Sequence, residues 1–314
     1  MSQSMDQKWL CFEKFAMPIS KMQKNKLLPA TLLTLVAAIW GIAFVMMKNT
    51  LQRLDVYSFL SWRFAIATAL LILFRPRVLK SINFAFLKKG MLIGLFLGSG
   101  YIFQSLGLTK TTVGKTGFIT GLYVVLTPLI GFLFLKKKIA KWDWFSAIIA
   151  TIGLGLLSFK GFGMGFGEFL VLISAALFAM HILALSTWAS NFDVYALTVL
   201  QLGTCAALTF IASLFSGFHT PPDHGVWAAV LFTAAFATAF AFIVQTWAQS
   251  FMSATSVAVI LTLESVFAVI LGLIFLSEKL TPRIAIGGVL VLVAMYLIIY
   301  FDSKSKVAEH SYHD

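Results

Sequence analysis

One carboxylate, Glu264, lies near the middle of an otherwise apolar segment. The segment Ser256–Leu276 reads S-V-A-V-I-L-T-L-E-S-V-F-A-V-I-L-G-L-I-F-L. In a helix that rises 1.5 Å per residue, Glu264 lies about 13 Å from the start, close to the centre of a bilayer. A charged side chain there is costly, so Glu264 is expected to face the protein interior. It is a candidate to bind the amino group of a ligand or to carry a proton; the alternative is a structural hydrogen bond to a neighbouring helix.

Five further side chains within apolar segments are candidates to line a path through the protein. Arg63 lies too deep to reach water freely and is expected to face the bundle, with backbone carbonyls or a loop acid as alternative partners. His181 is able to titrate near neutral pH, and packing against a polar neighbour is the simpler interpretation. Gln104 and Gln245 carry amides that either line a cavity or cross-link helices, for about 1 kcal/mol each. Trp40 is a candidate for a cavity wall.

The composition excludes a soluble domain. The 314 residues are 60% hydrophobic and 11% charged, whereas an average soluble domain is about a quarter charged. The net charge of +12 comes from basic clusters between apolar segments, which is typical of membrane topology rather than of nucleic-acid binding. Cys11 and Cys205 form neither a disulfide framework nor a metal-binding pattern, so no metal and no cofactor is expected.

Ten apolar segments are long enough to cross a bilayer as helices. Most lysines and arginines fall on the side of the N-terminus, which predicts that both termini are cytoplasmic. Pro128 is expected to loosen the fourth span. The predicted spans are Leu27–Met47, Tyr57–Phe74, Gly90–Leu108, Thr116–Leu135, Trp142–Phe159, Phe169–Trp188, Tyr195–Phe215, Val226–Trp247, Ser256–Leu276 and Ile284–Phe301.

The sequence repeats itself at a constant spacing. Gln104 matches Gln245, 141 positions later, and residues 101–140 follow this spacing without a gap. Matches among Leu, Ile, Val and Phe are common in so apolar a chain, but a paired Gln is harder to explain by chance. At this spacing Tyr123 matches Glu264, which predicts a hydroxyl opposite the carboxylate.

The first two spans have counterparts as well. Trp40 matches Phe178 and Arg63 matches Gln201, in both cases 138 positions later, so Gln201 is also expected to face the bundle. Each copy has five spans, an odd number, and the second copy must therefore cross the membrane in the opposite sense. This predicts an all-α integral membrane protein of ten transmembrane helices in two inverted five-helix repeats, the plan of many secondary transporters.

The repeat also predicts the domain organisation. A cytoplasmic tail is followed by the first repeat, a Gly-rich linker, the second repeat and a second cytoplasmic tail. The predicted boundaries are 1–26, 27–159, 160–167, 168–301 and 302–314.

Five short motifs and one longer run carry a resemblance to a known family. The motifs are W-G-I-A-F (40–44), R-F-A-I-A (63–67), Q-T-W-A-Q (245–249), L-E-S-V-F-A (263–268) and L-S-E-K-L-T (276–281), and the run covers residues 104–129. In this order they resemble the EamA family of the drug/metabolite transporter superfamily, over residues 28–301. The resemblance implies a secondary carrier of ten helices, typically an exporter of small metabolites, with a central cavity between the halves. Two features differ from the family pattern: Ser265 stands where Pro is usual, and Lys136-Lys137 where Gly-Glu is frequent.

Together these features predict a secondary transporter in the plasma membrane, the inner membrane of a bacterium, rather than an enzyme. Its expected partners are the lipid bilayer and a small metabolite such as an amino acid, an amine or a drug-like compound, with a proton as a candidate coupling ion and no nucleic acid. Transport is expected to proceed outward, by alternating access of the two repeats. The alternatives are a membrane-embedded enzyme, although no H-E-x-x-H or G-x-S-x-G motif is present, and a non-transporting scaffold.

Overall fold

A computed structural model describes residues 27–136, 138–158, 165–275 and 281–310. The predicted N-terminal tail, residues 160–164 of the predicted linker and the end of the second tail lie outside these ranges. Within them the chain is helical almost throughout and contains no strand. The first half forms α3 (Leu27–Thr50), α4 (Val56–Phe74), α5 (Phe84–Lys110), α6 (Val113–Gly121), α7 (Tyr123–Leu135) and α8 (Lys141–Ser158), with a 3₁₀ turn at Pro76–Ser81.

The second half repeats this order of helices. It forms α9 (Phe166–Trp188), α10 (Val194–Ser216), α11 (His224–Ala234), α12 (Ala241–Gln249), α13 (Ala254–Leu261), α14 (Leu263–Phe275) and α15 (Pro282–His310). A π-helix, Ala235–Phe240, joins α11 to α12, and a short 3₁₀ turn, Ala189–Asn191, follows α9.

Ten helical spans cross the bundle, which confirms the predicted fold class. In the described part of the chain, nine are long and apolar enough to span a bilayer. The tenth, α8, has 18 residues and a polar first turn with Lys141 and Asp143. The protein is therefore a multi-pass integral membrane protein.

Side-chain caps explain where the helices begin. The Asn83 side chain accepts a hydrogen bond from the backbone N–H of Phe86, 2.8 Å away, so α5 starts six residues before the predicted Gly90. Hydropathy locates the apolar part of a helix, whereas a cap satisfies free N–H groups at its first turn. Lys89 in the extra turn lies over the Phe192 ring, 5.0 Å from its centroid. The helix thus extends past its apolar part.

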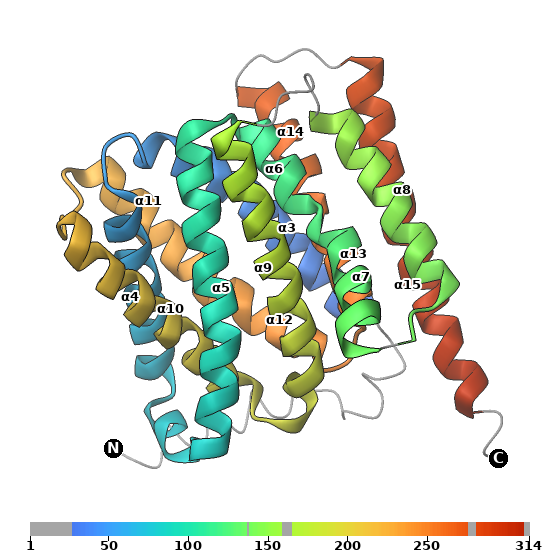
Figure 1. Cartoon of the computed structure of the whole chain (residues 1–314), viewed down its shortest axis with the longest axis horizontal. Helices are drawn as coiled ribbons and strands as arrows, with labels where there is room; N and C mark the ends of the chain where they lie inside the picture. Colours follow the sequence, from blue (N-terminus) through green and yellow to red (C-terminus); the bar gives the residue numbers. More distant parts are fainter. Residues whose placement is uncertain (1–26, 137, 159–164, 276–280, 311–314) are drawn as a thin grey trace.

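Each end of the bundle has an ion pair between the two repeats. Arg53 pairs with Asp223 at one end, and Arg75 pairs with Asp193 across 3.2 Å at the other. We call these the Arg53 end and the Arg75 end; the Arg75 end is the lower one in Figure 1. Exposed pairs of this kind contribute little stability, but they mark where the repeats meet.

The fourth span of each repeat is broken in the same way. Leu122 separates α6 from α7, and Thr262 separates α13 from α14. The caps also correspond, since Thr112 caps α6 and Ser253, 141 positions later, caps α13. The chain continues as a helix through Pro128, and the interruption of this span lies six residues earlier, at Leu122. The equivalent last spans, α8 and α15, pack along each other at one side of the bundle (Figure 1).

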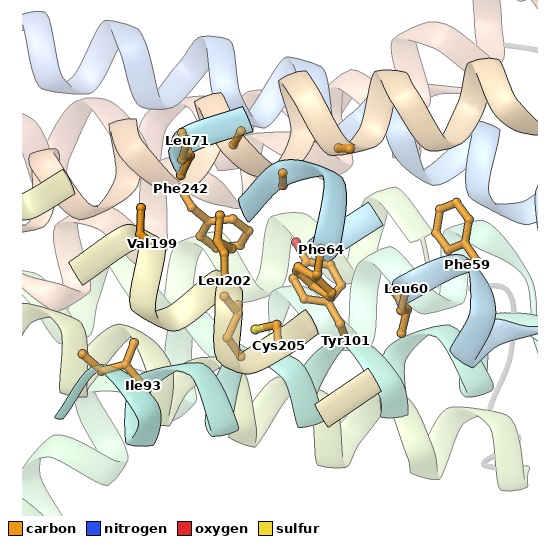
Figure 2. Packing of buried hydrophobic residues seen from close by; sticks show 14 of the residues in the cluster. Phe59, Leu60, Phe64, Leu71, Ile93, Tyr101, Val199, Leu202, Cys205 and Phe242 are labelled. Carbon is orange, nitrogen blue, oxygen red and sulfur yellow. The ribbon is translucent and has the colours of Figure 1, made fainter. Parts of the chain in front are cut away.

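The first half of α5 is held tightly against α10. Phe64 of α4, Tyr101 of α5 and Cys205 of α10 belong to one buried cluster (Figure 2). Nearby, the Cys205 thiol contacts the carbonyl oxygen of Gly94 at 3.3 Å. A Cβ atom added to Gly94 would lie 2.6 Å from the carbonyl oxygen of Gln201. Close backbone approach at small residues is typical of membrane helix packing.

Gly94→Ala is therefore expected to destabilise the protein by about 1–3 kcal/mol, because the added methyl group overpacks a backbone contact. The measurement is the melting temperature of the full-length protein in detergent. Gly203→Ala on α10 is the matched control, since a Cβ there lies 3.6 Å from the nearest atom and Ala favours the helix over Gly, so this change should not destabilise the protein. An unchanged melting temperature for Gly94→Ala would contradict the tight α5–α10 contact.

Candidate functional site

A cavity lies in the middle of the bundle, between the two repeats. Seven of the eight predicted site residues line it. From the first repeat these are Trp40, Arg63, Gln104 and Tyr123, and from the second His181, Gln245 and Glu264. The cavity volume is about 50 Å³, room for a few ordered water molecules at most. A metabolite of amino-acid size is larger than this, so the helices would have to move apart to bind one.

Glu264 is placed by the break in its span. It is the second residue of α14, two positions after Thr262, and only 4% of it is exposed. Within the described residues, its Oε1 atom is buried without a hydrogen-bond partner. Tyr123, the matching residue, begins α7 after the other break, and its hydroxyl is likewise buried and unpaired. Buried polar groups are normally hydrogen-bonded, so two unpaired groups on one cavity point to a ligand.

A third unpaired atom on the cavity is Oε1 of Gln245. Gln249 donates through its Nε2 to the Ile182 carbonyl at 2.8 Å and to the Ser186 hydroxyl at 2.6 Å. Its Oε1 must then accept, and it does so from Gln245 Nε2 at 3.0 Å. This chain fixes the Gln245 amide with its oxygen free as an acceptor.

Gln201 does not line the cavity; it lies behind His181. His181 Nε2 donates to Gln201 Oε1 at 2.8 Å, and Gln201 Nε2 donates to the Thr246 hydroxyl at 2.9 Å. With the amide in this orientation, His181 Nδ1 is left as an acceptor. The prediction that Gln201 faces the bundle agrees with its full burial, but its contacts are those of a residue that orients His181.

Gln104 and Trp40 each make a hydrogen bond at the cavity wall. Gln104 Nε2 donates to the Thr120 hydroxyl at 3.1 Å. Trp40 Nε1 donates to the Ala237 carbonyl in the π-helix at 2.9 Å. Both residues therefore also cross-link helices, which is the structural alternative for such side chains.

Arg63 is fully enclosed, with 1% of it exposed. Its Nε donates to the Thr238 hydroxyl at 2.6 Å and its Nη2 to the Ala237 carbonyl at 3.2 Å. The guanidinium also lies 4.7 Å from the centre of the Tyr101 ring, a cation–π distance. A backbone carbonyl, one of the two expected alternative partners, therefore binds Arg63, and a hydroxyl group binds it as well. In the described part of the chain, no carboxylate pairs with Arg63.

At the Arg53 end of the bundle, a hydrogen-bonded network joins the repeats. Glu168, in the first turn of α9, accepts from the Thr111 hydroxyl at 2.7 Å and from Lys115 Nζ at 2.8 Å. It also accepts from the backbone N–H of Gly165 at 3.1 Å. We call Glu168, Thr111 and Lys115 the Glu168 latch. Because Lys115 and Thr111 belong to the first repeat and Glu168 to the second, the latch must break if the repeats separate here.

The Arg75 end has no equivalent of the latch at the matching positions. At the spacings of the repeat, Thr111, Lys115 and Glu168 correspond to Met252, Ser256 and Ala30. Met252 and Ala30 are both buried and belong to one apolar cluster. The two ends of the bundle thus differ at these positions: charged and polar side chains meet at the Arg53 end, and apolar residues are buried at the Arg75 end.

Sequence reasoning missed several residues of the site. Tyr101 and Phe242 occupy matching positions in the two repeats, both line the cavity, and their rings lie 6.2 Å apart; the constant spacing was the signal that could have found them. Thr238 was missed because no sequence pattern marks the π-helix that presents it. Glu168 lies at the end of the Gly-rich stretch, where only the Gly165-x-x-Glu168 capping spacing indicates it.

The chain is similar to known transporters over most of its length. A model of the EamA-like transporter family matches residues 27–159 and again 165–300. An uncharacterized transporter from Archaeoglobus fulgidus is 35% identical over 270 residues, which cover 85% of this chain and 84% of that protein. The uncharacterized transporter YoaV from Bacillus subtilis is 24% identical over 285 residues, covering 87% and 97% of the two chains.

One solved structure, titled only as the crystal structure of a protein, has the same fold. It superposes with a TM-score of 0.71 at 15% sequence identity and covers 88% of this chain and 98% of its own. At that identity the likeness supports the fold alone. Two matches of the family model, a relative above 30% identity and a cavity between inverted repeats agree, and the chain belongs to the EamA-like transporter family of membrane transporters.

Proposed function

We propose that this transporter exports a small metabolite that carries an amino group, either an amino acid or an amine. The observation that carries the proposal is the set of three buried, unpaired polar atoms on the cavity: Glu264 Oε1, Gln245 Oε1 and the Tyr123 hydroxyl. An ammonium group has three N–H donors and no acceptor. A carboxylate with two further oxygen atoms is the complementary set, and the carboxylate supplies the charge.

Proton coupling is the second candidate role of Glu264. A carboxylate near the midplane that alternately holds a proton and a substrate is able to couple their movements. The unpaired Oε1 atom fits this role as well, since either a substrate N–H or its own proton would occupy the same position. The two roles differ in what Glu264→Gln retains, as discussed below. The alternatives of an enzyme and a scaffold have no comparable observation in their favour.

Alternating access fits the position of the cavity between two inverted repeats. In the proposed cycle the Glu168 latch breaks when the cavity opens at the Arg53 end, and the apolar contacts around Met252 separate when it opens at the Arg75 end. With both termini in the cytoplasm, the Arg53 end faces outward. Export then corresponds to loading from the Arg75 end and release at the Arg53 end.

The proposal is tested first by binding and then by flux. Full-length protein in detergent is screened for thermal stabilisation by amino acids, amines, nucleobases and drug-like compounds, because a bound ligand raises apparent stability. Compounds that stabilise are then tested for transport into proteoliposomes. Stabilisation and flux by amino-bearing compounds would support the proposal. Stabilisation only by compounds without an amino group would contradict it.

The orientation has its own test. A reporter fused after Asp314 is expected to report a cytoplasmic location, because basic residues predominate on the side of both termini. A cysteine in the exposed 217–220 segment should in turn be labelled by a membrane-impermeant reagent added outside intact cells. A reporter that reads external would reverse the proposed direction of the Arg53 end.

A further inference from the structure

In the described part of the chain, Arg63 has hydrogen-bond donors on the cavity that no oxygen atom accepts. A guanidinium has five N–H donors and cannot be deprotonated in proteins. Thr238 and Ala237 accept from Nε and Nη2, and the Tyr101 hydroxyl lies 3.5 Å from Nη2. Within the described residues, the one recorded contact of Nη1 is the Met47 sulfur at 3.4 Å. A thioether is a weak acceptor, so the Nη1 edge of this buried cation is left largely unsatisfied.

The π-helix holds the opposite edge of the guanidinium in place. The N–H of Ala241 bonds to the carbonyls of Phe236 and Thr238 and bypasses Ala237. The Ala237 carbonyl instead accepts from both Arg63 and Trp40. A π-turn inside an α-helix is frequently found at a functional site, and here it offers a backbone acceptor that faces another helix.

Thr238 sets the direction of Arg63. Its hydroxyl proton is used in a hydrogen bond to the Thr233 carbonyl at 2.8 Å. The oxygen is therefore left to accept, and it accepts from Arg63 Nε at 2.6 Å. With Nε and Nη2 fixed on the π-helix side, Nη1 is the part of the guanidinium left for a ligand.

We propose that Arg63 forms an anion subsite of the cavity, which binds the carboxylate of the transported molecule. The inference rests on the proposed function and narrows it to a zwitterion, because the ammonium group would lie at Glu264. Both side chains line the cavity, yet no ion pair joins them in the structure. A ligand with a carboxylate supplies the buried Arg63 with a counterion, whereas an amine leaves Arg63 without one. Thr238 acts as a positioning residue.

The test compares molecules that differ only at the carboxylate. The twenty standard L-amino acids are screened by thermal shift on the full-length protein. The amino acid that stabilises most is then compared with its methyl ester, which keeps the amino group but has no carboxylate. The wild-type protein is expected to bind the amino acid about 10- to 100-fold more tightly than the ester, the range for a lost charged hydrogen bond. Equal affinities would overturn the subsite.

Variants test whether Arg63 causes the preference for the amino acid over its methyl ester. Arg63→Gln is expected to bind the amino acid and the ester equally, and Arg63→Lys should retain part of the preference because it keeps the charge without the planar fork. Thr238→Val removes the acceptor for Nε at similar volume and should weaken amino-acid binding about tenfold while ester binding is unchanged. Thr238→Ser, which keeps the hydroxyl, should behave like wild type. A full preference in Arg63→Gln would overturn the proposal, and so would equal loss of both ligands in Thr238→Val.

The two proposals fail in different ways. If amines and esters stabilise the protein as well as amino acids do, the anion subsite is refuted and the amino-group site stands. If none of the amino acids, esters or amines stabilises it, the proposed function is refuted as well. The wild-type comparison decides the subsite even if an Arg63 variant does not fold.

Discussion

Glu264→Gln is expected to abolish net transport in proteoliposomes while the protein remains folded. The amide has nearly the shape of the carboxyl group but carries no charge. Removing one member of a buried, hydrogen-bonded charge pair costs about 2–5 kcal/mol, which corresponds to a loss of affinity of roughly 30- to several thousand-fold. Initial rates of uptake of a stabilising compound measure the effect, and the melting temperature without ligand measures folding.

Tyr123→Phe is the matched control for Glu264→Gln. Tyr123 occupies the equivalent position in the first repeat and its hydroxyl is also unpaired, but it contributes no charge. Its loss is expected to reduce flux about fivefold at most, in line with one neutral hydrogen bond. Exchange that continues in Glu264→Gln while proton-driven accumulation is lost would assign the carboxylate to the proton. Net flux near that of wild type from mildly acidic to mildly alkaline pH would leave Glu264 a structural role only.

A disulfide across the Arg53 end is expected to stop transport reversibly. A Cβ atom added to Gly167 lies 2.9 Å from Cβ of Lys110, and a disulfide requires about 3.5–4.5 Å between these atoms. A small separation of α5 and α9 would accommodate Lys110→Cys with Gly167→Cys, in a background without Cys11 and Cys205. Because the bond spans the two repeats beside the Glu168 latch, the oxidised protein should transport only through its unlinked fraction.

Reduction should restore flux in the same proteoliposomes. Lys110→Ser with Gly167→Ser is the matched control, because a Cβ at residue 167 is itself crowded by the Gly107 carbonyl at 3.2 Å. The control separates crowding from cross-linking. Full flux in completely linked protein would show that α5 and α9 stay together at this end during the cycle. The cavity would then have to open at the Arg53 end between other helices.

The ten spans and their inverted order could be predicted because both can be read directly from the order of residue types. Apolar length gives the spans, and a constant spacing gives the repeat. The same spacing pairs Tyr123 with Glu264, so the centre of the site was predictable as well. Long polar side chains within spans are rarely placed toward lipid, and for this reason most of the predicted site residues face the cavity.

The breaks at Leu122 and Thr262 were not predictable from residue types. Neither residue is Gly or Pro, and both keep a right-handed helical conformation. The interruption is a local tightening, in which the N–H of Val125 bonds to the Leu122 carbonyl and that of Ser265 to the Thr262 carbonyl. Pro128 is the residue type that most clearly indicates a helix break, but the helix continues through it.

The contacts between helices could not be predicted from the sequence either. Gln201 faces the bundle as predicted, but whether it meets the cavity or His181 depends on how α10 is rotated against α9. Arg63 meets Thr238 within the π-helix, which no sequence pattern marks. These contacts depend on how separate helices pack, whether their residues are 20 positions apart, as His181 and Gln201 are, or 175, as Arg63 and Thr238 are.

The paired breaks also bear on stoichiometry. A carrier assembled from two identical half-chains would present the same side chain at both breaks, and hence two carboxylates or none. In this fused chain the two positions have diverged to Glu264 and Tyr123. The matching positions hold one carboxylate per molecule. Under the proposed function, this position would bind one proton or one substrate ammonium in each turnover. The two-fold relation between the repeats thus includes the position of these side chains but not their charge.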